Sequence, residues 1–344
     1  TAAIQCAIDA AHAAGGGTVE LGEGTYLSGS IFLRSNVDFF IGQHARLLAS
    51  PDPADFNARD VCVQNSYSKH ENASGAHLIL CIEQENVTLR GPGTVDGNAP
   101  KYLLDANGRS YRMKQIPWRM SQLVYFVESK NLRLEDLRVR GAHYWSVFLH
   151  GCTDAVVRGL DVASGREYHS ASEPLTPQGD GIDLDCCRHV RVSDCRVSSN
   201  DDGITLRASS GRLKNPQDTS DVVISNCVVS SRSCAFRLGV GDRTVRDVTI
   251  GNVVIFNAYV AIDFCTSWGA GGVSYDNIRI DDVDVRDYSL FNLREGGGMV
   301  LQKNVLFSGT IKENLRWGNE NASDEELLSA LKTAQALDII QAKS

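Results

Sequence analysis

The chain of 344 residues carries 34 Lys and Arg against 42 Asp and Glu, a formal net charge of −8, and 42% of its residues are hydrophobic. This composition excludes a disordered or low-complexity chain. The acidic balance argues against a nucleic-acid partner, which needs a basic surface. No run of about 18 apolar residues occurs, so we expect no membrane-spanning helix.

The first eleven residues have the pattern of an amphipathic helix and precede three glycines at positions 15–17. We expect this helix to cap the first unit of the fold that follows it. The sequence leaves the compartment open: secreted or periplasmic if a leader precedes Thr1, and cytoplasmic if the free thiols are taken at face value. The ten Cys residues show no CxxC and no paired Cys/His spacing, which predicts buried free thiols rather than a zinc site.

A short pattern, a polar residue followed by alternating apolar residues, recurs seven times along the chain. The copies begin at Asn86, Asn131, Asp154, His189, Asp221, Asp247 and Asn277. A second strand-like pattern interleaves with the first, in segments that begin at Trp145, Gly181, Gly203, Ala235 and Ala261. Alternation with a period of two residues predicts strands with one buried face.

Repeats that consist of strands, with no helix in each copy, predict a solenoid. The Leu pattern of leucine-rich repeats is missing, and β-propeller blades would need four strands in about 40 residues. A parallel β-helix remains, in which coils stacked ~4.8 Å apart complete one another's hydrogen bonds and core. Extra residues in the longer coils form loops, which we expect to wall a groove on one side.

Two acidic clusters stand out in this repeat, Gly179-Asp180-Gly181-Ile182-Asp183-Leu184-Asp185 and Asn200-Asp201-Asp202-Gly203. Asp180 and Asp201 are 21 residues apart (201 − 180), close to one coil, so we expect the clusters on adjacent coils, directly above one another. Like charges this close raise the pKa of at least one carboxyl group, which creates an acid and a base. Hydrolysis of a glycosidic bond needs such a pair. Two alternatives stay open at this point: turn residues without a function, and a calcium site.

From Thr1 to roughly Asn277 the chain resembles the polygalacturonase family, glycoside hydrolase family 28. The motifs that carry the resemblance include Gly91-Pro-Gly-Thr-Val-Asp-Gly97, Asp180-Gly-Ile-Asp183 and Asn200-Asp-Asp-Gly-Ile204. The resemblance implies an all-β fold, a right-handed parallel β-helix of the pectin-lyase type with an N-terminal capping helix and a short α-helical C-terminal tail. It also implies hydrolysis with inversion at the anomeric carbon.

By the same resemblance, Asp201 corresponds to the general acid, and Asp180 and Asp202 to the carboxylates that activate water. Arg207 lies where the family has a Lys near the bound sugar acid, and Arg237 faces the same side of its strand as Ala235. We expect both arginines to contact the substrate. We also consider the aromatic cluster His143-Tyr144-Trp145, either as the lining of a sugar subsite or as internal packing.

The chain departs from the family at two motifs. Ser233-Cys234-Ala235 stands where a Gly-His-Gly motif is expected, and Ala261-Ile262-Asp263 stands where an Arg-x-Lys motif would grip a carboxylate. Cys234-Ala235 is weakly similar to the rhamnogalacturonan hydrolase branch of the family. The linkage cleaved therefore stays open between homogalacturonan and rhamnogalacturonan.

The C-terminal stretch resembles the Q-loop region of an ABC-transporter nucleotide-binding domain, with Gln302 as the Q-loop glutamine. Ser323, with Glu326 three residues on, predicts a capped helix whose apolar face contains Leu327, Leu328, Leu331 and Ala334. No G-x-x-x-x-G-K-[ST] phosphate loop occurs in the chain, so ATPase activity does not follow. We expect a β-helix domain over residues 1–280 and an incomplete ABC-like fragment over 281–344, with a helix that docks poorly or covers the last coil.

The leading hypothesis is an inverting glycoside hydrolase that takes a pectic carbohydrate and needs no metal or cofactor. The alternatives are a calcium-dependent polysaccharide lyase, a non-catalytic carbohydrate-binding solenoid and an ABC ATPase fragment that needs a partner. The oligomeric state is not predicted.

Overall fold

The computed structural model describes residues 1–65, 72–103, 116–164, 179–266 and 272–284, and in the C-terminal part residues 312, 315, 316, 319 and 321–333. The chain divides into two compact units, Thr1–Tyr288 and Ser289–Ser344, which are described separately. No helix among the described residues is both long and apolar enough to cross a membrane.

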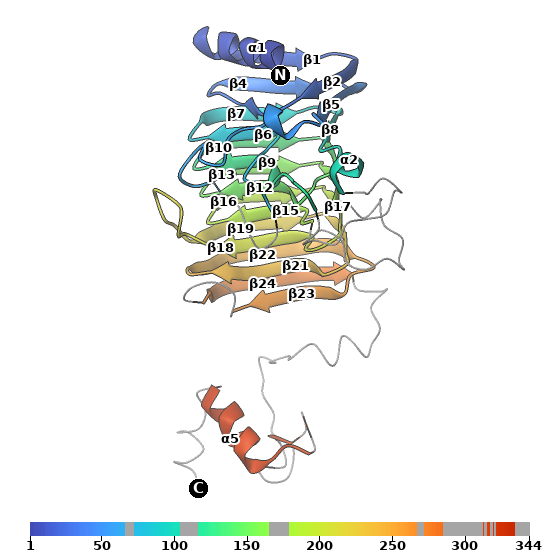
Figure 1. Cartoon of the computed structure of the whole chain (residues 1–344). Coiled ribbons are helices and arrows are strands. Elements are labelled where there is room, and N and C mark those ends of the chain that lie inside the picture. The colour runs from blue at the N-terminus through green and yellow to red at the C-terminus, as the bar shows by residue number, and fades with distance from the viewer. Residues whose placement is uncertain are drawn as a thin grey trace. The chain divides into compact units, whose positions relative to one another are not determined.

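The first unit is a right-handed parallel β-helix with three faces (Figure 1). The first face consists of β1 (Gly17–Leu21), β4 (Val37–Ile41), β7 (Glu85–Arg90), β10 (Lys130–Glu135), β13 (Thr153–Arg158), β16 (Arg188–Ser193), β19 (Thr219–Ser225), β22 (Thr244–Ile255) and β24 (Ser274–Asp284). The second face consists of β2 (Gly24–Ser28), β5 (Ala45–Ala49), β8 (Thr94–Asp96), β11 (Arg138–Arg140), β14 (Asp161–Ser164), β17 (Arg196–Ser199) and β20 (Val228–Ser231). The third face consists of β3 (Ile31–Phe32), β6 (Ile79–Ile82), β9 (Gln122–Val127), β12 (Trp145–His150), β15 (Ile182–Asp185), β18 (Ile204–Ala208), β21 (Cys234–Gly241) and β23 (Val260–Cys265).

The two sequence patterns are the first and third faces of this solenoid. Each of the seven polar starters opens or lies within a first-face strand, and the interleaved segments form the strands of the third face from β12 to β23. All seven starters have positive φ, between 48° and 58°. Asn and Asp tolerate this left-handed conformation better than most residues, which explains why polar residues recur at the start of each copy.

Side-chain hydrogen bonds link polar residues at corresponding positions of neighbouring coils, among them two of the starters and Asn36 one coil before them. Asn131 Nδ2 donates to Asn86 Oδ1 at 2.7 Å, and Asn86 Nδ2 donates to Asn36 Oδ1 at 2.8 Å. The polar starters therefore stabilise the stacking of the coils as well as the turn within each coil.

Inward-facing side chains of all three faces form one continuous apolar core. In β15 and β18 the inward residues are Ile182, Leu184, Ile204 and Leu206, each at most 1% exposed. All ten Cys residues are free thiols, and eight of them are buried, which confirms the expectation from their spacing.

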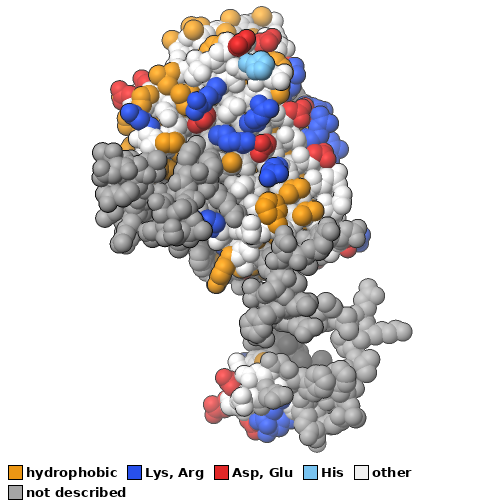
Figure 2. All heavy atoms as spheres, turned by 90° about the vertical axis from the view of Figure 1, so that its right-hand side faces the viewer, with side chains coloured by type: hydrophobic (Ala, Val, Ile, Leu, Met, Phe, Trp, Pro, Cys, Tyr) orange, Lys and Arg blue, Asp and Glu red, His pale blue; other side chains and the backbone are white. Residues whose placement is uncertain are grey.

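The second face is polar on its outside. Figure 2 shows the side of the molecule that carries labelled strands such as β2, β5, β8 and β17 in Figure 1, and there Lys and Arg side chains intermingle with Asp and Glu. Arg46 pairs with Asp96 at 2.8 Å and Arg140 pairs with Asp161 at 2.5 Å. Each pair joins two adjacent coils. Both pairs keep one side chain well exposed to solvent, so they balance the charge of the face more than they add to stability.

The other regular elements described in the first unit are helices. They are α1 (Ala2–Ala13), the 3₁₀ turn η1 (Pro53–Asp55) and α2 (Ala99–Leu103). Helix α1 buries Ile4 and Ile8 at the N-terminal end of the core, and its Gln5 side chain bonds the backbone N–H and C=O of Phe32 at 2.8 and 3.0 Å. The cap expected from residues 1–11 is therefore confirmed, and it covers edge strands that would otherwise pair with other chains.

The second unit is described mainly at its helix α5 (Asp324–Thr333). The Glu326 N–H donates to Ser323 Oγ at 3.2 Å, and the Ser323 N–H donates to Glu326 Oε2 at 2.8 Å, which confirms the capping box. Leu327 and Leu331 are buried, whereas Leu328 is 50% exposed, so the apolar face is narrower than the sequence predicted. Gln302 and Ala334 lie outside the described residues.

Replacement of the fully buried Ile8 by Ala should lower the stability of the first unit by about 2–5 kcal/mol, because it leaves a cavity beneath the cap. Cys6→Ala, at an exposed position of the same helix, is the matched control and should change stability by less than about 0.5 kcal/mol. Urea unfolding followed by circular dichroism measures both. Equal effects of the two substitutions would show that α1 does not cap the core.

Candidate active site

The two acidic clusters lie at the entrances to two adjacent strands of the third face. Asp180 precedes β15, and Asp201 and Asp202 precede β18. Ile182 pairs with Ile204, so this coil contains 22 residues (204 − 182). Asp202, rather than Asp201, is therefore the register partner of Asp180, and Asp201 lies one position to the side.

The glycine after each acid is required by the close stacking of the coils. A Cβ at Gly181 would lie 2.4 Å from the carbonyl oxygen of Gly203, and a Cβ at Gly203 would lie 2.5 Å from that of Ala235. Neither glycine has positive φ, so the requirement is close approach and not a special backbone conformation. The repeated Asp-Gly dipeptide thus has a structural reason that concerns the glycine and leaves the role of the aspartates open.

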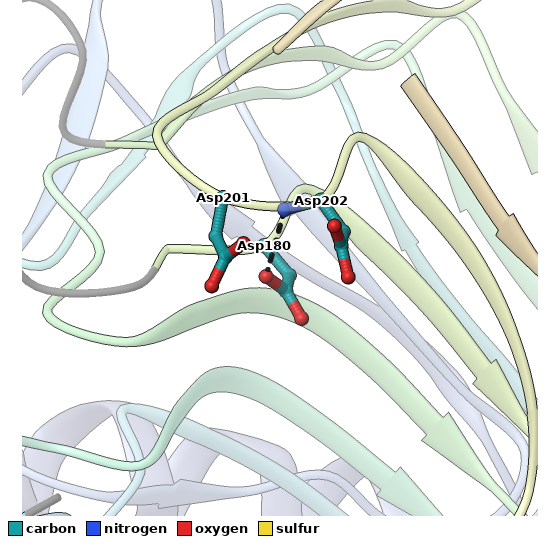
Figure 3. A group of neighbouring side chains, drawn as sticks. All are labelled: Asp180, Asp201 and Asp202. Carbon is teal, nitrogen blue, oxygen red and sulfur yellow. Dashed lines mark hydrogen bonds between the residues drawn. The ribbon is translucent and has the colours of Figure 1, made fainter. Parts of the chain in front are cut away.

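The three carboxyl groups converge (Figure 3). One oxygen from each of Asp180, Asp201 and Asp202 lies within 4.8 Å of the others. The backbone N–H of Asp202 donates to Asp180 Oδ1 at 3.1 Å, which fixes the two coils at this point. Asp180 and Asp202 are buried, at 3% and 6% exposure, while Asp201 is partly exposed, so the cluster can be reached from its Asp201 side.

Arg237 of β21 joins the cluster from the next coil. Its Nε and Nη2 donate to the two oxygens of Asp202, the latter at 3.1 Å. Its Nη1 donates to Asp263 of β23, its register partner. The guanidinium is only 12% exposed and therefore forms the centre of a chain from Asp202 to Asp263.

Arg207 of β18 lies at the other end of the acidic face and does not reach the three carboxyl groups. Its Nε is 3.4 Å from Asp185 Oδ2, and its guanidinium lies over the ring of Trp145, 4.9 Å from the ring centre. Burial lowers the pKa of Arg207, but the carboxyl groups of Asp185, Asp183 and Asp180 outweigh this effect and raise the pKa overall.

Burial raises the pKa of Asp180 well above its ordinary value, and the neighbouring carboxyl groups of Asp183, Asp201 and Asp202 raise it further. Asp183, outward-facing in β15, is fully buried, and burial raises its pKa in the same way. Neither carboxyl oxygen of Asp183 has a hydrogen-bond partner. The site therefore contains two carboxyl groups whose protonated form is favoured by burial.

We predicted no role for Asp183, Asp185 or Asp263 from the sequence. The alternation of β15 with a period of two could have indicated Asp183 and Asp185, because it places both on the outside of the third face. The structure adds that Asp185 is the register partner of Arg207. From the sequence, Asp263 was noted only as an acidic residue where the family's Arg-x-Lys motif is expected. Its pairing with Arg237 depends on the register of β21 and β23, which the sequence does not give.

In the aromatic cluster next to the site, His143 and Tyr144 are packed inside the protein and do not line a subsite. His143 is 1% exposed and bonds the Gly97 carbonyl and the Met120 N–H, and burial lowers its pKa to about 3. Tyr144 is 5% exposed and stacks on Trp145, with ring centres 4.3 Å apart. Trp145 is partly exposed and supports Arg207.

The carboxyl cluster lies on a parallel β-helix, and comparison with known proteins identifies the family. The family described as glycosyl hydrolases family 28 matches residues 59–289, that is 231 (289 − 59 + 1) of the 344 residues. The chain therefore belongs to glycosyl hydrolases family 28.

Individual relatives resemble separate parts of the chain. A probable polygalacturonase of Vitis vinifera is 23% identical over 271 residues, which cover 76% of this chain and 52% of that protein. A β-(1→2)-glucan export ATP-binding/permease protein of Nitrobacter winogradskyi is 50% identical over 64 residues, 19% of this chain and 10% of that protein. The chain thus spans about half the length of the first relative and a tenth of the second. The match to the second relative confirms that part of the chain resembles ABC transporters.

Solved structures agree on the fold. A family 28 exopolygalacturonase of Yersinia enterocolitica superposes with a TM-score of 0.61 at 18% identity, over 82% of this chain and 62% of that chain. This likeness confirms the pectin-lyase-type β-helix.

Replacement of Asp183 by Asn should raise the melting temperature, and more so as the pH rises. The pKa of Asp183 is raised in the folded state relative to about 3.9 in the unfolded chain, so ionisation of this group favours unfolding above pH 4. Asn carries no charge at any pH, so the gain should be near zero below pH 4 and grow as the pH rises toward 8. Differential scanning calorimetry from pH 3.5 to 8 measures it, with the exposed Asp276→Asn as control. A gain independent of pH would contradict burial as the cause.

Proposed function

We propose that the protein is an inverting glycoside hydrolase that cleaves a pectic poly- or oligosaccharide, of the polygalacturonase or rhamnogalacturonan hydrolase type. The observation that carries the proposal is the convergence of Asp180, Asp201 and Asp202, with one oxygen of each within 4.8 Å of the others, on adjacent coils of a family 28 β-helix. The names of the similar plant and bacterial polygalacturonases support a pectic substrate.

In this proposal Asp201 protonates the leaving glycosidic oxygen. It is the most exposed of the three acids, so a sugar can reach it. Asp180 and Asp202 lie deeper and accept the proton of the attacking water. The raised pKa of Asp180 favours its protonated form, so Asp180 acts as a base only after it has lost that proton. The pair with Arg237 holds Asp202, the second acceptor, in place.

The spacing of the oxygens does not itself predict inversion. Separations of about 5–5.5 Å between carboxyl groups are typical of retaining glycosidases, and about 6.5–9.5 Å of inverting ones. We propose inversion because the family resemblance implies it, and because a third carboxyl group gives the attacking water two acceptors besides the acid. The stereochemistry of the product decides between the two mechanisms.

Asp201→Asn should lower kcat by about 10²–10⁴-fold, because the amide cannot protonate the leaving group. The assay incubates the protein with oligogalacturonides and with rhamnogalacturonan oligosaccharides and follows the first products by ¹H NMR. New reducing ends of inverted configuration, lost in Asp201→Asn and kept in Asp276→Asn, are the expected result. Products of retained configuration would contradict inversion, and a 4,5-unsaturated product that disappears with EDTA would identify a lyase. Full activity of Asp201→Asn would remove the proposed acid.

Arg237→Gln should lower kcat more than it changes KM, because Asp202 loses the partner that fixes its position. A loss of about tenfold or more is expected, since removal of one member of a buried ion pair leaves the other charge uncompensated. Arg237→Lys should restore part of kcat. Arg191→Gln, on the exposed surface of β16, is the matched control. A pure increase of KM in Arg237→Gln would instead indicate that Arg237 acts by direct contact with the sugar.

A further inference from the structure

The outside of the third face is unusually poor in available positive charge. In the sequence of its eight described strands the only Lys or Arg residues are Arg207 and Arg237. Within these strands and the three residues that precede each of them, six carboxyl groups (Asp180, Asp183, Asp185, Asp201, Asp202 and Asp263) stand against four arginines, because Arg119 precedes β9 and Arg232 precedes β21. A ligand that lies along this face meets more negative than positive charge.

Both arginines are already engaged by carboxyl groups of the chain. Arg237 donates to Asp202 on one side and to Asp263 on the other, and Arg207 is paired with Asp185 and lies over Trp145. Two carboxylates and the Cys234 thiol already accept from Arg237, so a sugar carboxylate would compete with Asp263 or Asp202 for its donors. Displacement of Asp202 would disturb the proposed base, and displacement of Asp263 would place two carboxylates side by side. Like charges brought together in a binding site are strongly unfavourable.

The same residues suit hydroxyl groups. The side chain of Asp263 is 36% exposed and offers carboxylate oxygens, which accept hydrogen bonds from sugar hydroxyls. A carboxylate acceptor beside a cation that is already paired favours a polyol over an anion.

We infer that the sugar unit seated over Arg237 and Asp263 is uncharged, so that the enzyme cleaves next to a neutral glycosyl unit and not within a run of free galacturonates. This inference rests on the proposed function and adds the charge of the substrate to it. A neutral deoxyhexose and a methyl-esterified uronate share the required chemistry, and the experiment separates them.

The test compares three substrates of equal length: oligogalacturonides with free carboxylates, the same oligogalacturonides fully methyl-esterified, and rhamnogalacturonan oligosaccharides. We expect kcat/KM for the free acid to be at least tenfold below the value for one of the other two. Preference for the ester identifies an esterified uronate, and preference for rhamnogalacturonan identifies a neutral deoxyhexose. Equal or faster cleavage of the free acid would overturn the inference and leave the hydrolase proposal intact.

A variant pair isolates the local charge. Asp263→Lys should raise kcat/KM for the free acid at least tenfold relative to the ester, because it frees Arg237 from one carboxylate and adds a cation. Asp276→Lys makes the same change in net charge at an exposed position of β24 and should leave the ratio unchanged. Equal effects of both substitutions would show that overall charge, and not this pair, sets the preference.

Binding measurements keep the inference testable if no substrate is cleaved. Isothermal titration calorimetry with Asp201→Asn and the same three ligands should give the weakest binding for the free acid, with the difference shrinking at 0.5 M NaCl because salt screens the repulsion. Tighter binding of the free acid would overturn the inference. If the wild-type protein cleaves none of the three ligands but still binds the free acid most weakly, only the hydrolase proposal is overturned. Circular dichroism confirms that each variant is folded.

Discussion

The stacking of one coil on the next is the interaction on which the rest of this structure depends. Every strand described in the β-helix pairs in parallel with the strand above or below it, so each residue is placed against a residue one coil away. The core, the polar ladders of Asn and Asp, and the carboxyl cluster are all consequences of this register. Glycine at positions 181 and 203 is needed because the coils approach too closely there for a Cβ.

The register also concentrates charge. On the third face, outward positions of adjacent strands carry Asp183 and Thr205, then Arg237 and Asp263, in one continuous row. Burial raises the pKa of Asp180 and of Asp183, whereas the ion pair with Arg237 occupies Asp202. Neighbouring carboxyl groups of one residue type therefore have different environments, which is the condition for dividing acid and base roles among them.

The C-terminal segment is similar to a different class of protein from the β-helix. The segment similar to ABC transporters covers a fifth of the chain, and the sequence contains no phosphate-binding loop that would make it an ATPase. Its described helix α5 has a complete capping box and two buried leucines, so it has the local features of a stable helix. The chemistry proposed for the chain resides in the β-helix alone.

The sequence by itself determined the solenoid, because alternation with a period of two and a recurring polar starter at positive φ have few other structural solutions. It also determined that Asp180 lies near Asp201 and Asp202, since a repeat of about one coil converts distance along the chain into contact. The sequence did not determine that Asp180 is paired with Asp202 and not with Asp201. The coils differ in loop length, so the exact number of residues in this coil could not be read from the repeat. Only the tertiary structure decided that Asp183 is buried without a partner and that Asp263 occupies Arg237, because burial and cross-strand pairing depend on what lies in the neighbouring coils.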